Sequence, residues 1–123
     1  SYNERINIIF VGDGSVLGFV YNSSTQADMR QTYDMFLQNK YSIRYANNDF
    51  SLWINGVNFK KGSSGSVPTI NSLGLFSYGN SNQLIGKTKS IQHYDYLSDA
   101  EMEALTGYDS YSAMTSQFNF NTL

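Results

Sequence analysis

Short apolar runs separated by turn residues dominate the first part of the chain. Residues 5–11 (RINIIFV) form a continuous run rich in β-branched side chains, and residues 16–21 form a second one. Gly12-Asp13-Gly14-Ser15 lies between them and has the composition of a tight turn. The pattern predicts a β-hairpin over this region.

The middle of the chain predicts three further strands. Apolar and polar side chains alternate over residues 40–46 and again over residues 50–54. Asn47-Asn48-Asp49 separates these two runs, and Asn and Asp tolerate the positive φ of a turn. Asn55-Gly56 then predicts a type I′ hairpin, which needs positive φ at both positions, and residues 57–60 pair back.

Beyond residue 60 the pattern is weaker. Residues 61–69 form a loop rich in Gly and Ser, and strands are expected near residues 70–78 and 87–96, on either side of a polar loop at 79–83. Ser98 and Glu101 form a capping box that predicts one short helix near Ser98–Thr106. Residues 108–123 have no clear period and are interpreted as a C-terminal strand or tail.

Residues 28–38 have a pattern that local reasoning does not resolve. Met29, Tyr33, Phe36 and Leu37 fall at helical spacing, although the neighbouring segments all predict strands. Helix and strand therefore both stay open for this segment.

Together the elements predict an all-β protein, an antiparallel β-sandwich with one short helix. A length of 123 residues suits one domain, assigned to residues 1–107, and the ten Tyr and eight Phe favour strands. The net charge is −2 with eight scattered Lys and Arg, which gives no support to nucleic-acid binding. No apolar run has the roughly 20 residues of a membrane-spanning helix, so no membrane insertion is expected.

Three groups of residues, in order, resemble a known family. The first is residues 45–57 (YANNDFSLWINGV), the second is Gly65-Ser66-Val67-Pro68 followed by Leu73 and Leu75, and the third is residues 91–101 (IQHYDYLSDAE) closing at Leu105-Thr106. This stretch, Tyr41 to Gly107, resembles the C-terminal half of the concanavalin A-like (laminin G-like) sandwich of phage tail-fibre and other virion proteins.

The resemblance implies a jelly-roll sandwich, of which this chain would be a part, with the first strands expected upstream of Ser1. It also implies a place in a virion, beside other virion proteins and in a homo-oligomer, with a trimer favoured. The function expected is a non-catalytic structural or receptor-binding module, in a tail fibre or capsid appendage, that binds cell-surface carbohydrate. A purely architectural role without a ligand is the alternative. A glycan-degrading enzyme is the least supported reading, because no facing pair of carboxylates is evident.

Trp53 is the first candidate for sugar binding. It alternates onto one strand face with Ser51 and Asn55, and an aromatic ring beside polar groups can stack on a sugar. The competing interpretation places Trp53 in the core or at a subunit interface. A second candidate is the loop that carries Tyr78, Asn80 and Asn82.

Calcium is the one cofactor that the sequence suggests. Asp13 and Asp49 both lie in predicted turns, where backbone carbonyl oxygens could complete a set of oxygen ligands. Turn formation alone explains both residues as well. The lone histidine, His93, has no neighbouring nucleophile and acid that would make it catalytic, and no catalytic residue is assigned.

Overall fold

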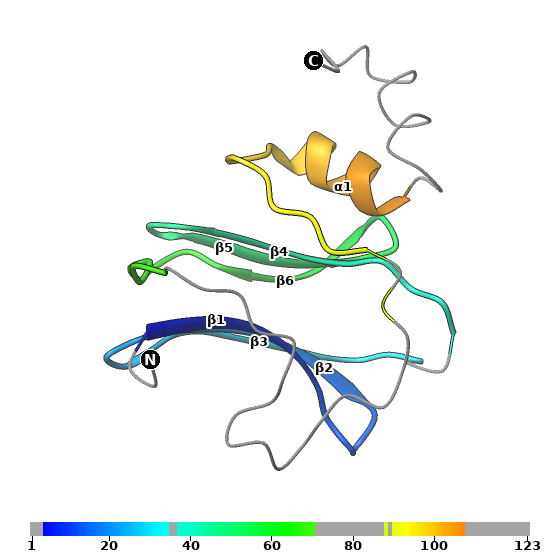
Figure 1. Cartoon of the computed structure of the whole chain (residues 1–123), viewed down its shortest axis with the longest axis horizontal. Coiled ribbons are helices and arrows are strands. Elements are labelled where there is room, and N and C mark those ends of the chain that lie inside the picture. Colours follow the sequence, from blue (N-terminus) through cyan, green and yellow to red (C-terminus); the bar gives the residue numbers. More distant parts are fainter. Residues whose placement is uncertain (1–3, 35–36, 71–87, 89, 108–123) are drawn as a thin grey trace.

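Two antiparallel three-stranded sheets stacked face to face form the body of the protein, and helix α1 covers the outside of the second sheet (Figure 1). The structure is a computed structural model, and it describes residues 4–34, 37–70, 88 and 90–107. The all-β fold with one short helix is confirmed within these residues. Each sheet is built from strands that follow one another along the chain.

The N-terminal sheet contains β1 (Glu4–Phe10), β2 (Ser15–Asn22) and β3 (Thr25–Thr32), in that spatial order. Register pairs Phe10 with Val16 across the first turn. Because strand side chains alternate between faces, Val16, Gly18 and Val20 point toward the second sheet. A Cβ added at Gly18 would lie 3.3 Å from the Cδ1 atom of Ile43, so glycine allows close approach of the sheets here.

The C-terminal sheet contains β4 (Tyr41–Ala46), β5 (Asp49–Ile54) and β6 (Val57–Gly62). Two hairpin turns connect these strands, and both have the backbone that the sequence predicts. The φ angle is 60° at Asn48, and it is 48° at Asn55 and 85° at Gly56. The predictions of turns at these positions are therefore confirmed.

The hydrophobic core lies between the two sheets. Its buried members come from β2, β3 and β5: Val20, Ala27, Met29, Phe50 and Leu52. Ile6, Ile43, Tyr45 and Val67 pack against them and are partly buried. The alternation of apolar residues in β5 thus has the expected cause, since one face of that strand fills the space between the sheets.

Helix α1 spans Asp99–Gly107 and begins with the predicted capping box. The Ser98 hydroxyl accepts a hydrogen bond from the Glu101 amide at 3.3 Å, and the Glu101 carboxylate accepts one from the Ser98 amide at 3.1 Å. Met102, Ala104 and Thr106 are buried, and the helix contacts all three strands of the C-terminal sheet.

The structure decides between helix and strand for part of residues 28–38 and corrects the strand expected at residues 87–96. Residues 25–32 form strand β3, so the part of residues 28–38 that this strand covers is not helical. Ala27 and Met29 are buried while Asp28 and Arg30 are exposed, which is the period of two that a sheet with one covered face imposes. The expected strand at residues 87–96 is wrong for the described positions, 88 and 90–96, which have no strand structure.

The order in which the strands are connected can be compared with that of a jelly roll. The six described strands form two successive three-stranded meanders, with a single connection between the sheets at residues 33–40. A jelly roll moves between its sheets more often than this. The described strands alone do not have the strand order of a jelly roll, so the jelly-roll order implied by the family resemblance stays a prediction.

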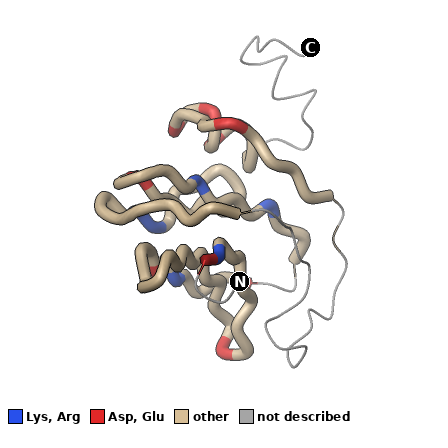
Figure 2. The backbone as a smooth tube through the Cα atoms, turned by 60° about the vertical axis from the view of Figure 1, so that its left-hand side comes forward, with Lys and Arg blue, Asp and Glu red and all other residues tan. Residues whose placement is uncertain are grey.

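Charged residues are distributed over both sheets, as Figure 2 shows. Lys and Arg do not gather on one face, whereas α1 carries the acidic residues Asp99, Glu101 and Glu103. In the described part of the chain, no helix has the length and apolarity needed to cross a membrane.

Candidate functional site

Aromatic rings and asparagine side chains meet at one end of the sandwich, where the β1–β2 and β5–β6 turns lie. We call this group the amide–aromatic cluster. Its members are Phe10, Tyr33, Asn39, Tyr41, Asn55 and Phe59. They come from both sheets and from the 33–40 connection, so only the folded sandwich brings them together.

The rings form two edge-to-face pairs, each of which joins the two sheets. Phe10 at the end of β1 meets Tyr41 at the start of β4, with ring centroids 5.0 Å apart and planes at 76°. Tyr33 after β3 meets Phe59 of β6 at 5.6 Å and 76°. Edge-to-face contact is a favourable aromatic geometry, so these pairs close the end of the space between the sheets.

Asparagine side chains connect the two aromatic pairs. The Asn55 Nδ2 group donates to the Tyr33 hydroxyl at 3.1 Å and to the Asn39 Oδ1 atom at 3.0 Å. The Asn39 Nδ2 group donates in turn to the Tyr41 hydroxyl at 2.8 Å. A continuous polar chain thus runs from one tyrosine to the other through two amides.

Asn55 is held on its other side by the backbone. Its Oδ1 atom accepts a hydrogen bond from the Lys40 amide at 2.9 Å, and its own amide donates to the Lys40 carbonyl at 3.0 Å. The positive φ of Asn55 turns its side chain away from the face of β5 and toward the 33–40 connection. The turn therefore sets the position of the amide at the centre of the cluster.

The cluster is accessible at the surface. Phe10 is 36% exposed, the rings of Tyr33, Tyr41 and Phe59 are half-buried, and Asn55 is exposed. Leu37 and Val57, at the same end of the sandwich, are 63% and 51% exposed. Exposed aromatic and apolar residues gathered beside fixed polar groups are typical of a ligand-binding surface.

Both phenol groups of the cluster can serve as hydrogen-bond donors. The oxygen of each phenol accepts a hydrogen bond from an asparagine side chain, Tyr33 from Asn55 and Tyr41 from Asn39. The phenol proton is therefore not used in that bond. Burial raises the pKa of Tyr41 above the ordinary phenol value, so this hydroxyl keeps its proton at neutral pH. The cluster thus combines uncharged O–H donors with partly exposed ring faces.

The opposite end of the sandwich is polar, but its oxygens are already used within the chain. Three consecutive backbone amides after β6 each donate to a side-chain oxygen there: Gly65 to Asn48 at 3.0 Å, Ser66 to Gln26 at 2.9 Å and Val67 to Asn47 at 3.0 Å. These bonds fix the loop in place. The amide–aromatic cluster is therefore the stronger candidate for ligand binding.

Trp53, the first candidate from the sequence, lies beneath helix α1. It is 4% exposed and Ser51 is fully buried, and the Trp53 indole nitrogen donates to the Ser51 hydroxyl at 2.9 Å. A ring in this position has no face free for a sugar. The expectation of a surface platform at Trp53 and Ser51 is therefore corrected in favour of the competing interpretation, a packed residue.

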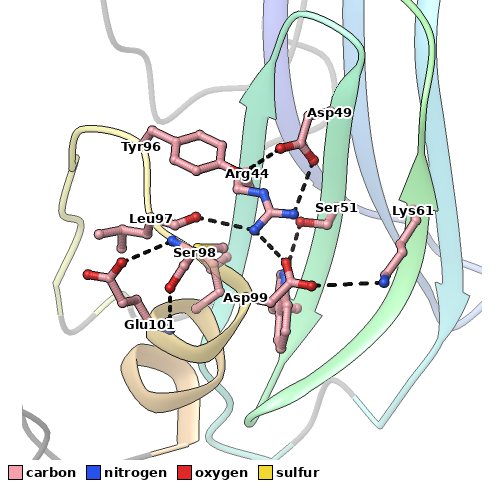
Figure 3. Close-up of polar contacts among 12 residues, drawn as sticks. Arg44, Asp49, Ser51, Lys61, Tyr96, Leu97, Ser98, Asp99 and Glu101 are labelled. Carbon is pink, nitrogen blue, oxygen red and sulfur yellow. Dashed lines mark hydrogen bonds and ion pairs between the residues drawn. The ribbon is translucent and has the colours of Figure 1, made fainter. Parts of the chain in front are cut away.

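The contacts that hold α1 over this face centre on Arg44 (Figure 3). Its guanidinium pairs with Asp99 at 2.6 Å and with Asp49 at 3.0 Å, and it donates to the Leu97 carbonyl at 3.2 Å. Burial would lower the pKa of Arg44, but the two carboxylates outweigh this effect and raise the pKa. The Cζ atom of Arg44 lies 5.3 Å from the centroid of the Tyr96 ring, and the Tyr96 hydroxyl donates to the Asp49 carboxylate at 2.8 Å.

The calcium candidates lie in different sheets, Asp13 in the turn between β1 and β2 and Asp49 at the first position of β5. Asp13 accepts hydrogen bonds from the backbone and hydroxyl of Ser15 and pairs with Arg30 at 3.5 Å. The bonds from Ser15 lower the pKa of Asp13. Asp49 belongs to the Arg44 network. No group of three or more acidic, histidine or cysteine side chains suited to a metal is found in the described part of the chain, and the structure does not bring these two together.

Tyr78, Asn80 and Asn82 lie outside the described residues. His93 is exposed, and its Nε2 atom lies 2.7 Å from the Tyr45 hydroxyl. Of the predicted binding residues that the structure describes, Trp53, Ser51 and Asn55, only Asn55 belongs to the cluster. Sequence reasoning missed the other five members of the cluster, Phe10, Tyr33, Asn39, Tyr41 and Phe59. The one signal that leads to the cluster is the Asn55-Gly56 turn, whose positive φ redirects the asparagine.

Comparisons with known proteins concern the fold alone. No protein-family model matches the chain, and no curated protein matches its sequence. Among solved structures the chain is similar to residues 221–444 of an S-layer domain-containing protein from Clostridium thermocellum, with a TM-score of 0.50 and 17% identity. The match covers 86% of this chain and 58% of that one, so this chain spans little more than half of that fragment.

Proposed function

We propose that this protein is a non-catalytic module that binds cell-surface carbohydrate through the amide–aromatic cluster. The observation that carries the proposal is the pair of tyrosine hydroxyls, each held by an asparagine and set beside a partly exposed ring. Sugars offer apolar C–H faces that stack on rings and hydroxyls that accept from phenols.

Two physical features support a sugar as the ligand. The hydrogen bonds that link Asn39 and Asn55 fix the side chains before a ligand arrives, which reduces the entropy cost of binding. The members of the cluster are phenyl, phenol and amide groups, and the carboxylate of Asp34, which acts electrostatically on Tyr41, would repel an anionic sugar. Uncharged groups of this kind suit neutral sugars better than sialylated ones, for which a guanidinium would be the matching partner.

The setting of the module is part of the proposal. We place it in a virion, as a part of a tail fibre or capsid appendage beside other virion proteins and in a trimer. This placement is supported by the resemblance of Tyr41 to Gly107 to the concanavalin A-like domains of virion proteins.

A glycan array tests the proposal. The wild-type protein is compared with a Tyr33→Phe/Tyr41→Phe variant, which keeps both rings and loses both phenol hydroxyls. Tyr21→Phe is the matched control, because Tyr21 stacks on Phe19 outside the cluster. We expect selective binding by the wild type and the control and its loss in the double variant. Equal binding by all three proteins would exclude the cluster as the site.

An architectural role is the second candidate, and β1 is the observation that favours it. Ile9 is 37% exposed at the end of β1, which pairs only with β2 among the described strands. An apolar edge strand can join a partner chain. Light scattering of the wild type and of Ile9→Lys tests this role. A wild-type oligomer that dissociates in the variant would support it, and a folded wild-type monomer would exclude the version in which partner chains complete the sandwich.

A further inference from the structure

We propose that Thr106 in helix α1 is a positioning residue for the amide–aromatic cluster, and that it acts through Gly56 on the side chain of Asn55. The proposal deepens the function proposed above, and its binding consequences rest on that function. Its structural consequences can be measured without a ligand.

The Thr106 hydroxyl is fixed by two hydrogen bonds. It donates to the Met102 carbonyl one turn earlier at 2.9 Å, and it accepts from the Gly56 amide at 2.8 Å. Because the proton is committed to Met102, a lone pair of the oxygen points to the turn between β5 and β6. Thr106 is 4% exposed, so water does not compete for these bonds.

Gly56 fits against the end of the helix with little space to spare. A Cβ at this position would lie 3.2 Å from the Cα atom of Gly107 and 3.5 Å from the Glu103 carbonyl oxygen. The φ angle of 85° at Gly56 also favours glycine. The turn is therefore seated on α1 by backbone contact as well as by the bond to Thr106.

Asn55 is the neighbour of Gly56 in the same two-residue turn. Its side chain makes bonds to Tyr33, Asn39 and the Lys40 amide, so a shift of the turn would change three contacts together. The helix thus has a function beyond covering Trp53. It holds the backbone from which the central amide of the cluster projects.

The far end of α1 has its own anchor, which makes the contribution of Thr106 separable. Arg44 pairs with Asp99 at 2.6 Å at the start of the helix. Loss of the Thr106 hydroxyl therefore releases the turn while the first turn of the helix stays attached. Trp53 fluorescence reports whether α1 remains over the sheet, because this sole tryptophan lies beneath it.

The experiment compares Thr106→Val, which keeps the shape and loses the hydroxyl, with Thr106→Ser, which keeps the hydroxyl. Ser98→Ala is the matched control, because it weakens the other end of the same helix without touching Gly56. The readouts are the NMR signals of the Asn55 side-chain amide, hydrogen exchange at the Gly56 amide, and binding to an array of immobilised neutral glycans.

We expect Thr106→Val to shift the NMR signals of the Asn55 side-chain amide. Hydrogen exchange at the Gly56 amide should become about tenfold faster and array binding about tenfold weaker, which corresponds to the loss of one hydrogen bond. Thr106→Ser should restore all three readouts, and Ser98→Ala should leave the Asn55 signals and binding close to wild type. Unchanged Asn55 signals in a folded Thr106→Val protein would overturn the proposal.

Two further outcomes separate this proposal from the proposed function. A wild-type protein that binds no array glycan, with Asn55 signals that still shift in Thr106→Val, would refute glycan binding and keep the positioning role. If Thr106→Val does not fold, the wild type decides: slow exchange at the Gly56 amide supports the bond to Thr106, and exchange at the rate of an open loop overturns it.

Discussion

Replacing Arg44 by Met should loosen helix α1 from the C-terminal sheet and leave the core between the sheets intact. The methionine keeps the apolar stem of the side chain and removes the guanidinium. The variant loses the pairs with Asp99 and Asp49, the bond to the Leu97 carbonyl and the contact with the Tyr96 ring. None of these partners belongs to the core cluster.

The magnitude follows from the exposure of the partners. The Arg44 side chain is 9% exposed, whereas the side chains of Asp49 and Asp99 are 34% and 54% exposed. Removing one partner of a fully buried pair costs about 3–5 kcal/mol, and an exposed pair contributes at most about 1 kcal/mol. Because a buried guanidinium meets half-exposed carboxylates, we expect a loss of about 2 kcal/mol in the free energy of unfolding.

Urea unfolding followed by Trp53 fluorescence and by circular dichroism measures this loss. With a slope of about 2 kcal/mol per molar urea, the midpoint should fall by about 1 M. Lys60→Met is the control, because Lys60 is exposed on β6 and its replacement should change the midpoint little. A loss below about 0.5 kcal/mol in Arg44→Met would refute the idea that Arg44 anchors the helix.

Three other predictions concern the sheets, the acid limb of stability and the helix cap. Gly18→Val should destabilise the fold by about 1–3 kcal/mol in urea unfolding, because its side chain would press on Ile43 across the core; an unchanged midpoint would contradict this packing. The Ser15 bonds lower the folded-state pKa of Asp13, so their contribution is complete above the ordinary value of 3.8 and is lost as the pH falls through the lowered value. Asp13→Asn should therefore flatten the pH dependence of the urea midpoint on the acid side, and an identical profile would count against the assignment. Ser98→Ala should cost about 1 kcal/mol by removing the N-cap, and no change in the midpoint would mean that this cap does not stabilise α1.

Local chemistry made several elements predictable from the sequence. The Asn55-Gly56 turn needs positive φ at two positions, and few residue pairs other than Asn-Gly adopt it readily. The capping box of Ser98 and Glu101 depends on residues three apart, so it too can be read locally. The strands on either side of the Asn55-Gly56 turn were predictable as well, because β5 alternates between apolar and polar residues and β6 follows directly from the hairpin turn.

Burial and long-range contacts explain what could not be predicted. The alternation in β5 predicts that Trp53 and Ser51 lie on a solvent-exposed face of the sheet. Helix α1, which comes from a distant part of the chain, covers that face instead. Met29 and Tyr33 have helical spacing, yet residues 25–32 pair with β2 as strand β3 and the Met29 side chain is buried between the two sheets. In such cases the tertiary contacts outweigh the local pattern.

The candidate site was predictable only at Asn55. Tyr33, Asn39 and Tyr41 come from the connection between the sheets and the start of β4, and their meeting with Asn55 depends on the stacking of one sheet on the other. No short-range spacing in the sequence encodes that meeting. A search for asparagines in predicted positive-φ turns beside aromatic-rich connections would have pointed toward it.

Chemical-shift mapping of a bound neutral glycan tests the central claim most directly. A glycan selected on the array is titrated into the isotope-labelled wild-type protein, and the shifts of backbone and Asn side-chain amides are followed. Binding at the amide–aromatic cluster predicts the largest changes at Tyr33, Asn39 and Asn55, with small changes at Asn48 and Ser66 at the opposite end of the sandwich. The largest changes at Asn48 and Ser66, or no saturable change at any residue, would contradict the account.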